Sequence, residues 1–110
     1  MSDDFKKNHK PEPLRLREQI QNMPGWQIKK ERLEKIYQFE DFSSAIIFVN
    51  KLVNPIEENQ NYPRLLITYN RVFVSLFTNQ AGGVTLLDLD MAKEFDALAG
   101  AQPETKSPDS

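Results

Sequence analysis

The chain has 110 residues, enough for one domain with its own hydrophobic core. It contains no cysteine, which excludes disulfides and thiolate metal sites, and its formal net charge of −2 disfavours a general surface for nucleic acid or anionic membranes. No apolar run approaches about 20 residues, and no apolar segment follows Met1, so we expect a cytoplasmic protein without a transmembrane helix or a secretory signal.

The two ends of the chain lack hydrophobic periodicity. Residues 1–13 are mostly charged or polar, and residues 100–110 carry Pro, Ser, Thr and Lys without an apolar anchor. We therefore predict a disordered arm (1–13), one folded domain (14–99) and a disordered tail (100–110). The one histidine, His9, lies in the arm, so the folded domain is expected to contain none.

The first predicted element is a short amphipathic helix over residues 14–23. Its apolar residues recur at helical spacing: Leu16, Ile20 and Met23. Pro24-Gly25 should end it, because both residues disfavour a helix interior. Two strands are predicted next, over 26–31 and 33–39, with a turn at Glu31-Arg32.

The strongest helical pattern begins after Asp41, a suitable N-cap. Its apolar stripe is predicted to contain Phe42, Ala45, Ile46, Val49, Leu52, Val53 and Ile56. Ile47 and Phe48 fall off this stripe, which predicts a second apolar face for a partner or another subunit. Pro55 is expected to kink or break the helix, with Asn54 as a new N-cap.

A β-hairpin is predicted between Arg64 and Thr78, with Asn70-Arg71 as its two-residue turn. The core face should carry Leu65, Ile67, Tyr69, Val72, Val74 and Leu76. The opposite face has three large apolar residues: Leu66, Phe73 and Phe77. Either another helix or subunit covers them, or they form a partner-binding patch.

The last helix is predicted to begin after Thr85, with Asp88 as its capping-box partner, and to end near Gly100. Its core residues should be Leu87, Met91, Phe95 and Leu98. The element order is then α-β-β-α-β-β-α. This order predicts an α+β domain in which a four-stranded antiparallel sheet carries helices packed on one face.

Residues 57–88 resemble the signature of the pterin-4a-carbinolamine dehydratase family. That signature has an acidic residue, three spacers, two histidines and a proline, followed by an aromatic residue, another histidine and an aspartate. The frame is present at Glu57, Pro63, Tyr69 and Asp88. The three histidine positions hold Asn61, Tyr62 and Asn79. The resemblance covers about residues 14–99 and implies the family fold, with homodimers or homotetramers.

The family's reaction, as the resemblance implies it, removes water from a 4a-hydroxytetrahydropterin. One group takes a proton from a ring nitrogen and another assists the departing hydroxyl, and histidine suits both roles. Asn61 and Asn79 can only hydrogen-bond, and Tyr62 can donate a proton but is a poor base. Glu57, Glu58 and Asp88 are the carboxylates that remain, although Glu57 and Asp88 also suit structural roles in helix turns and caps.

Three functions follow from these observations. The first is a non-catalytic protein that binds a protein partner, for example as a Rubisco assembly chaperone, a branch that Asn61-Tyr62-Pro63 resembles. The second is a 4a-hydroxytetrahydrobiopterin dehydratase with replaced acid–base groups. The third is a transcriptional or dimerisation cofactor that acts through the long helix. We expect no metal and no cofactor beyond a pterin ligand, and no direct contact with nucleic acid or membranes.

Overall fold

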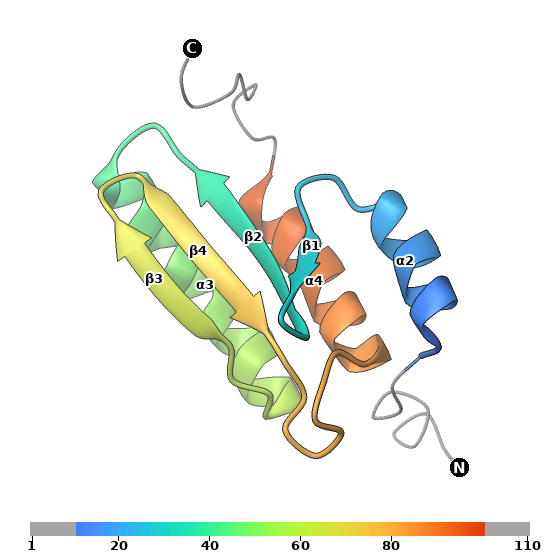
Figure 1. The fold of residues 1–110 in the computed structure, drawn as a ribbon. Coiled ribbons are helices and arrows are strands. Elements are labelled where there is room, and N and C mark those ends of the chain that lie inside the picture. The colour runs from blue at the N-terminus through green and yellow to red at the C-terminus, as the bar shows by residue number, and fades with distance from the viewer. Residues whose placement is uncertain (1–10, 101–110) are drawn as a thin grey trace.

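The computed structural model in Figure 1 describes residues 11–100 as three helices and four strands. In chain order these are α2 (Pro13–Gln21), β1 (Gln27–Lys29), β2 (Arg32–Gln38), α3 (Phe42–Asn59), β3 (Arg64–Thr68), β4 (Arg71–Leu76) and α4 (Leu86–Ala99). The strands form one antiparallel sheet in the order β1-β2-β4-β3. The predicted α+β fold is confirmed. His9, with residues 1–10 of the predicted arm and 101–110 of the predicted tail, lies outside the described residues.

The core lies between the sheet and the two longer helices. α3 and α4 cover one face of the sheet, and α2 lies beside α4 near β1 (Figure 1). The largest fully buried apolar side chains are Leu33, Tyr37, Leu52, Val72, Val74, Leu76, Leu89, Met91 and Phe95. Met23 and Trp26 extend this core beneath α2. Because α2 itself has no fully buried residue, its partly buried Leu16 and Ile20 attach it weakly to the domain.

The helix α3 buries a stripe that differs from the predicted one. Phe48 is only 2% exposed, and its ring centroid lies 4.7 Å from that of Tyr37 and 5.0 Å from that of Phe39. Phe42 and Val53, which were predicted to face the core, are 52% and 50% exposed. The prediction of a second apolar face is therefore wrong for Phe48, which belongs to the core. The buried stripe contains Ala45, Phe48, Leu52, Pro55 and Ile56.

The predicted break near Asn54 is also wrong, because α3 continues through Pro55 to Asn59. Pro55 and Ile56 are both buried, so packing of the last turn offsets the backbone hydrogen bond that proline cannot make. The side-chain amide of Asn59 donates to the carbonyl of Pro55 at 2.8 Å. The helix ends at Gln60, whose left-handed backbone (φ 49°) turns the chain toward Asn61.

Both hairpins turn one residue earlier than predicted. Thr68 pairs with Arg71, which leaves Tyr69-Asn70 as the turn of the second hairpin. In the first hairpin the pairing leaves Lys30-Glu31 in the turn, and both of these residues have a positive φ. The second turn is held by Asn70, whose side-chain amide donates to the carbonyl of Phe39 at 2.8 Å.

The earlier turn removes Tyr69 from the predicted core face. Tyr69 has a φ of 54° and is 67% exposed. The remaining hairpin residues keep their predicted faces, because Leu65 pairs with Val74. On the opposite face Leu66 pairs with Phe73 and is 60% exposed.

A carboxylate on α4 joins two other segments of the fold. Asp96 accepts hydrogen bonds from Trp26 Nε1 at 3.1 Å, from Lys35 Nζ at 2.9 Å and from the Tyr37 hydroxyl at 2.5 Å. Lys35 also lies over the ring of Tyr37, with Nζ 4.7 Å from the ring centroid. The segment before β1, the strand β2 and the helix α4 are thereby fixed to one another.

Tyr37 is expected to make the fold sensitive to alkaline pH. Burial, and then the hydrogen bond to Asp96, raise the pKa of Tyr37 above its ordinary value. Above about pH 10 the unfolded chain loses this proton while the folded chain keeps it, so the free energy of unfolding falls as pH rises. Urea unfolding at several pH values between about 8 and 11 measures the decline. Tyr37→Phe should reduce this fall in the free energy of unfolding, and Tyr69→Phe should not. An equal fall with pH in the wild type and in Tyr37→Phe would contradict the prediction.

Candidate active site

Three segments of the chain meet at the buried carboxylate of Asp88, in the first turn of α4. Its Oδ1 accepts from Asn61 Nδ2 at 2.8 Å. Its Oδ2 accepts from Thr78 Oγ1 at 2.6 Å and from the backbone N–H of Thr85 at 2.9 Å. Asp88 is fully buried and Asn61 is 8% exposed. This arrangement, which we call the Asp88 link, ties the exit of α3, the end of β4 and the start of α4 together.

The capping box predicted for α4 is confirmed. The Thr85 side chain accepts from the backbone N–H of Leu87, while Asp88 accepts from the backbone N–H of Thr85. Asp88 therefore has two structural roles at once, as a helix cap and as the acceptor for Asn61. Thr78 is a further member of the link, and no motif in the sequence pointed to it.

The Asp88 link is expected to make a large contribution to stability. Asp88→Ala leaves the buried donors of Asn61, Thr78 and Thr85 without their acceptor, which should lower the free energy of unfolding by about 2–3 kcal/mol. Asp90→Ala is a matched control, because Asp90 is exposed on the same helix and should change stability by less than about 0.5 kcal/mol. Urea unfolding of both variants measures the difference. Equal losses would show that the link is not needed for stability.

A second pair of signature residues is exposed to solvent. The Tyr62 hydroxyl donates to Glu57 Oε1 at 2.8 Å, and Tyr62 is 61% exposed. The hydrogen bond to Glu57 raises the pKa of the Tyr62 phenol above its ordinary value, which itself lies well above neutral pH. We call these two residues the Glu57–Tyr62 pair. It offers a proton donor and a proton acceptor in contact with each other.

The loop after β4 carries Asn79, the third position where the signature has histidine. Thr78 forms an isolated bridge with Gly83, and the backbone N–H of Gly82 donates to the Thr78 carbonyl at 3.0 Å. Gly82 has a φ of 69°, a conformation that glycine adopts without strain. Asn79 is exposed beside Thr78, and its side chain makes no hydrogen bond with any residue between 11 and 100.

The structure thus sorts the predicted site residues into two groups. Asn61 and Asp88 form a buried structural contact, in which both oxygens of the carboxylate accept hydrogen bonds. Glu57 and Tyr62 form an exposed contact, and Pro63 follows them directly at the start of the hairpin. Glu58 is exposed and takes no part in either contact. The Glu57–Tyr62 pair is therefore accessible to a substrate from solvent, while the Asp88 carboxylate is fully buried.

Nothing in the described part of the chain forms a metal site. Within residues 11–100 there is no group of three or more His, Cys, Asp or Glu side chains that would hold an ion. None of the helices described there is long and apolar enough to span a bilayer.

Comparison with known proteins identifies the family. A family model for pterin 4 alpha carbinolamine dehydratase matches residues 9–98 of the chain. The chain belongs to the pterin-4a-carbinolamine dehydratase family. A protein from Thermosynechococcus vestitus, named "Putative pterin-4-alpha-carbinolamine dehydratase", is 44% identical over 79% of this chain and 92% of its own length. A protein of the same name from Sulfurisphaera tokodaii is 44% identical over 76% of this chain and 89% of its own length.

Two solved structures of the pterin-4a-carbinolamine dehydratase type share this fold. The crystal structure of a transcriptional coactivator/pterin dehydratase from Brucella melitensis superposes with a TM-score of 0.79 at 32% identity, covering 83% of this chain and 99% of that chain. A pterin dehydratase-like protein described as a RuBisCO assembly factor in the alpha-carboxysome superposes with a TM-score of 0.57 at 24% identity. The match covers 70% of this chain and 89% of that chain. The second likeness shows the fold alone.

Proposed function

We propose that the protein is a slow 4a-hydroxytetrahydropterin dehydratase in which Glu57 is the base and Tyr62 is the acid. The observation that carries this proposal is the exposed hydrogen bond between Tyr62 and Glu57, at 2.8 Å, within the segment that bears the family signature. Membership of the family supports the reaction type. The proposed rate is slow because a phenol with a raised pKa is a weaker general acid than an imidazolium.

The reaction needs one proton removed and one proton delivered. In the proposed step the Glu57 carboxylate takes the proton from N5 of the pterin while the Tyr62 phenol protonates the hydroxyl on C4a. The C4a–O bond then breaks, water leaves, and the electron pair from N5 forms the C4a=N5 double bond of a quinonoid dihydropterin. The 2.8 Å hydrogen bond gives Glu57 a direct path for returning its proton to Tyr62. One water is lost, and both side chains end as they began.

The test of this function is a dehydration assay with three single substitutions. Stopped-flow absorbance follows the loss of a 4a-hydroxytetrahydropterin. Glu57→Gln and Tyr62→Phe should each lower the rate by about 10²-fold, the lower end of the range for acid–base catalysis. Glu58→Gln changes the neighbouring exposed carboxylate and should keep the wild-type rate. A wild-type rate equal to the uncatalysed rate, or full activity in Tyr62→Phe, would overturn the proposal.

Non-catalytic protein binding is a second candidate function. It is favoured by the Asp88 link, in which both oxygens of a fully buried carboxylate accept structural hydrogen bonds, and by Leu66, which is 60% exposed on the sheet. Rubisco assembly is one such role, and a homodimer or homotetramer remains our expectation from the family resemblance. Native mass spectrometry of the purified protein alongside the assay separates the two functions. A specific protein complex together with a background dehydration rate favours this second candidate.

A further inference from the structure

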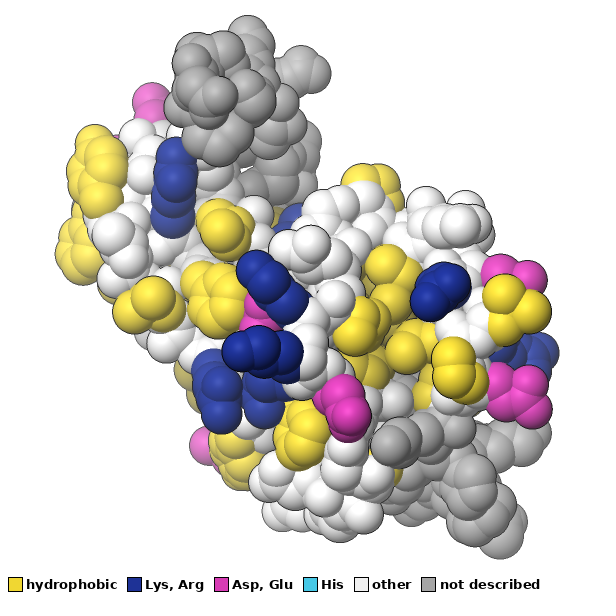
Figure 2. All heavy atoms as spheres, in the orientation of Figure 1, with side chains coloured by type: hydrophobic (Ala, Val, Ile, Leu, Met, Phe, Trp, Pro, Cys, Tyr) yellow, Lys and Arg dark blue, Asp and Glu magenta, His cyan; other side chains and the backbone are white. Residues whose placement is uncertain are grey.

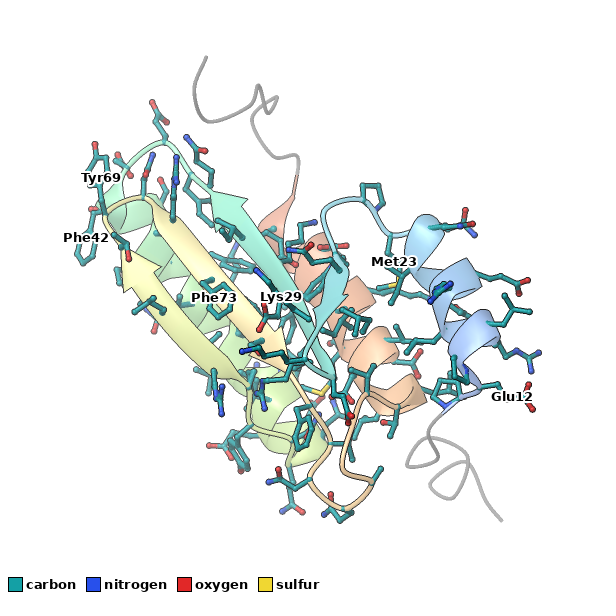
Figure 3. The ribbon with its side chains drawn as sticks, in the orientation of Figure 1. Glu12, Met23, Lys29, Phe42, Tyr69 and Phe73 are labelled. Atoms are coloured by element: carbon teal, nitrogen blue, oxygen red, sulfur yellow. The ribbon has the colours of Figure 1, made fainter. Side chains whose placement is uncertain are left out.

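Cationic side chains gather on the face of the sheet that the helices leave uncovered. Lys29 pairs with Arg32 across β1 and β2, and Arg64 pairs with Ser75 across β3 and β4. Figure 2 shows Lys and Arg side chains clustered over one end of the sheet, with hydrophobic and acidic side chains beside them. Figure 3 shows Lys29 on the same face as Phe73. We call Lys29, Arg32 and Arg64 the cationic cluster.

Arg32 is held in one orientation by the strand beside it. Its Nε donates to Ser75 Oγ at 2.6 Å, and one terminal nitrogen donates to the Ser75 carbonyl at 3.1 Å. Its guanidinium carbon lies 4.9 Å from the centroid of the Phe77 ring. A guanidinium has five N–H donors, so Arg32 keeps donors for a further acceptor. Because the group is already ordered, binding an anion would cost it little entropy.

The cationic cluster has more positive than negative charge. One carboxylate lies among these residues on the same face, that of Glu34, and it accepts a hydrogen bond from Ser75 Oγ at 3.1 Å. The one ion pair among residues 11–100 is Lys35–Asp96, so no carboxylate there lies within ion-pair distance of Arg32 or Arg64. Burial and then repulsion by the charge of Arg64 lower the pKa of Arg32, while the charges of Glu34 and Asp88 raise it. An anion placed between the two arginines would remove this repulsion.

The cationic cluster adjoins the candidate active site. Arg64 follows Tyr62 by two residues and begins β3, and it pairs with Ser75, which accepts two hydrogen bonds from Arg32. In a tetrahydropterin the side chain is attached to C6, which is bonded directly to N5. A pterin with N5 at Glu57 therefore carries its side chain on the carbon next to the reacting nitrogen. From Arg64, two residues after Tyr62, the cluster extends across the uncovered face of the sheet to Arg32 and Lys29.

We propose that Arg32 and Arg64 form an anion subsite of the pterin site, and that the substrate is a tetrahydropterin whose side chain carries a phosphate or carboxylate group. This inference rests on the proposed function, because it assigns the substrate class of the same site. Two arginines suit a phosphate or carboxylate, since each guanidinium can give two parallel hydrogen bonds. A neutral hydroxylated side chain would leave the charge of the cluster uncompensated.

The first arm of the test compares two 7,8-dihydropterins that differ only in a terminal phosphate on the side chain. Isothermal titration at low salt should show that the phosphorylated compound binds the wild type about tenfold more tightly or better. Arg64→Gln should remove this difference in affinity, because it removes one of the two guanidinium groups of the subsite. The variant should keep the fold, since Arg64 is exposed and its side chain makes no hydrogen bond in the described structure. Arg71→Gln is the matched control, since Arg71 is an exposed arginine at the other end of the hairpin and should leave the difference unchanged.

The second arm probes the anion subsite without a pterin. Pyrophosphate added to the isotope-labelled protein should shift the NMR signals of the Arg32 Nε–H and of the Arg64 and Ser75 amides. Equal binding of the two dihydropterins, or an Arg64→Gln variant that keeps the preference, would overturn the inference while leaving the dehydratase function intact. Pyrophosphate shifts with no binding of either dihydropterin would instead overturn the pterin site, and with it the assigned substrate class.

Discussion

The double variant Asn61→His, Tyr62→His is expected to dehydrate a 4a-hydroxytetrahydropterin about 10²–10⁴ times faster than the wild type. Asn61 Nδ2 lies 2.8 Å from Asp88 Oδ1, so a histidine there can donate its own N–H to the same carboxylate. That contact would fix the tautomer of the imidazole and raise its basicity. A histidine at position 62 lies within reach of Glu57, which now accepts from Tyr62. The two positions together would regain groups that titrate near neutral pH.

The control for this gain is a variant with two histidines placed elsewhere. Asn54→His, Tyr69→His makes the same chemical changes at two exposed positions outside the site, and should keep the wild-type rate. Stopped-flow assays of the three proteins give the comparison, and far-UV circular dichroism confirms that each is folded. The buried position 61 must accept a larger ring, which costs about 1–3 kcal/mol in a packed interior. A folded double variant with no gain in rate would contradict the family geometry that we assign to these positions.

Phe48→Ala is expected to lower the free energy of unfolding by about 3–5 kcal/mol, a large part of the stability of a small domain. Phe48 is 2% exposed and packs on Tyr37 and Phe39, so the substitution leaves a cavity between α3 and the sheet. Tyr37 also carries the hydrogen bond to Asp96, so the cavity lies next to the contact that fixes α4.

The residue next to Phe48 provides a matched control. Ile47 is 56% exposed, and Ile47→Ala should change stability by less than about 0.5 kcal/mol. Urea unfolding followed by Trp26 fluorescence measures both variants. A small loss for Phe48→Ala would contradict this packing and would favour the stripe predicted from the sequence, which contains neither Phe48 nor Ile47.

The N-cap residues predicted where α3 and α4 begin more accurately than the hydrophobic pattern predicted which face of α3 is buried. Asp41 accepts from the backbone N–H of Ser44, and Thr85 with Asp88 forms the capping box, both as predicted. Each cap depends on side chains within three residues, so local sequence determines it. The break at Pro55 was predicted by the same local reasoning and is absent, because burial of Pro55 and Ile56 is a tertiary effect.

The face of α3 could not be chosen from periodicity. The helix is apolar around more than half its circumference, and stripes that include Phe42 or Phe48 have the same spacing. The sheet decides between them through the rings of Tyr37 and Phe39, which lie in and just after β2, outside the helix itself. The turns were predicted one residue late for a related reason, since pairing across the whole strand sets the register.

The sequence predicted which residues belong to the candidate site, but not which of them contact one another. The resemblance named Glu57, Asn61, Tyr62 and Asp88, yet it did not show which of them touch. The structure pairs Asn61 with Asp88 over 27 positions of sequence, and Thr78 joins them without belonging to any motif. Contacts of this kind depend on where three chain segments converge, which a single sequence does not record.

The Asp88 link also bears on how such a site changes during evolution. Its donors and acceptor hold the exit of α3, the end of β4 and the start of α4 in place without help from Glu57, Tyr62 or Asn79. Substitutions at those three exposed positions can therefore accumulate with little loss of stability. The buried residues that maintain the fold around the site are different from the exposed residues that determine its reactivity. The same fold can therefore gain, weaken or exchange an activity through a few surface substitutions.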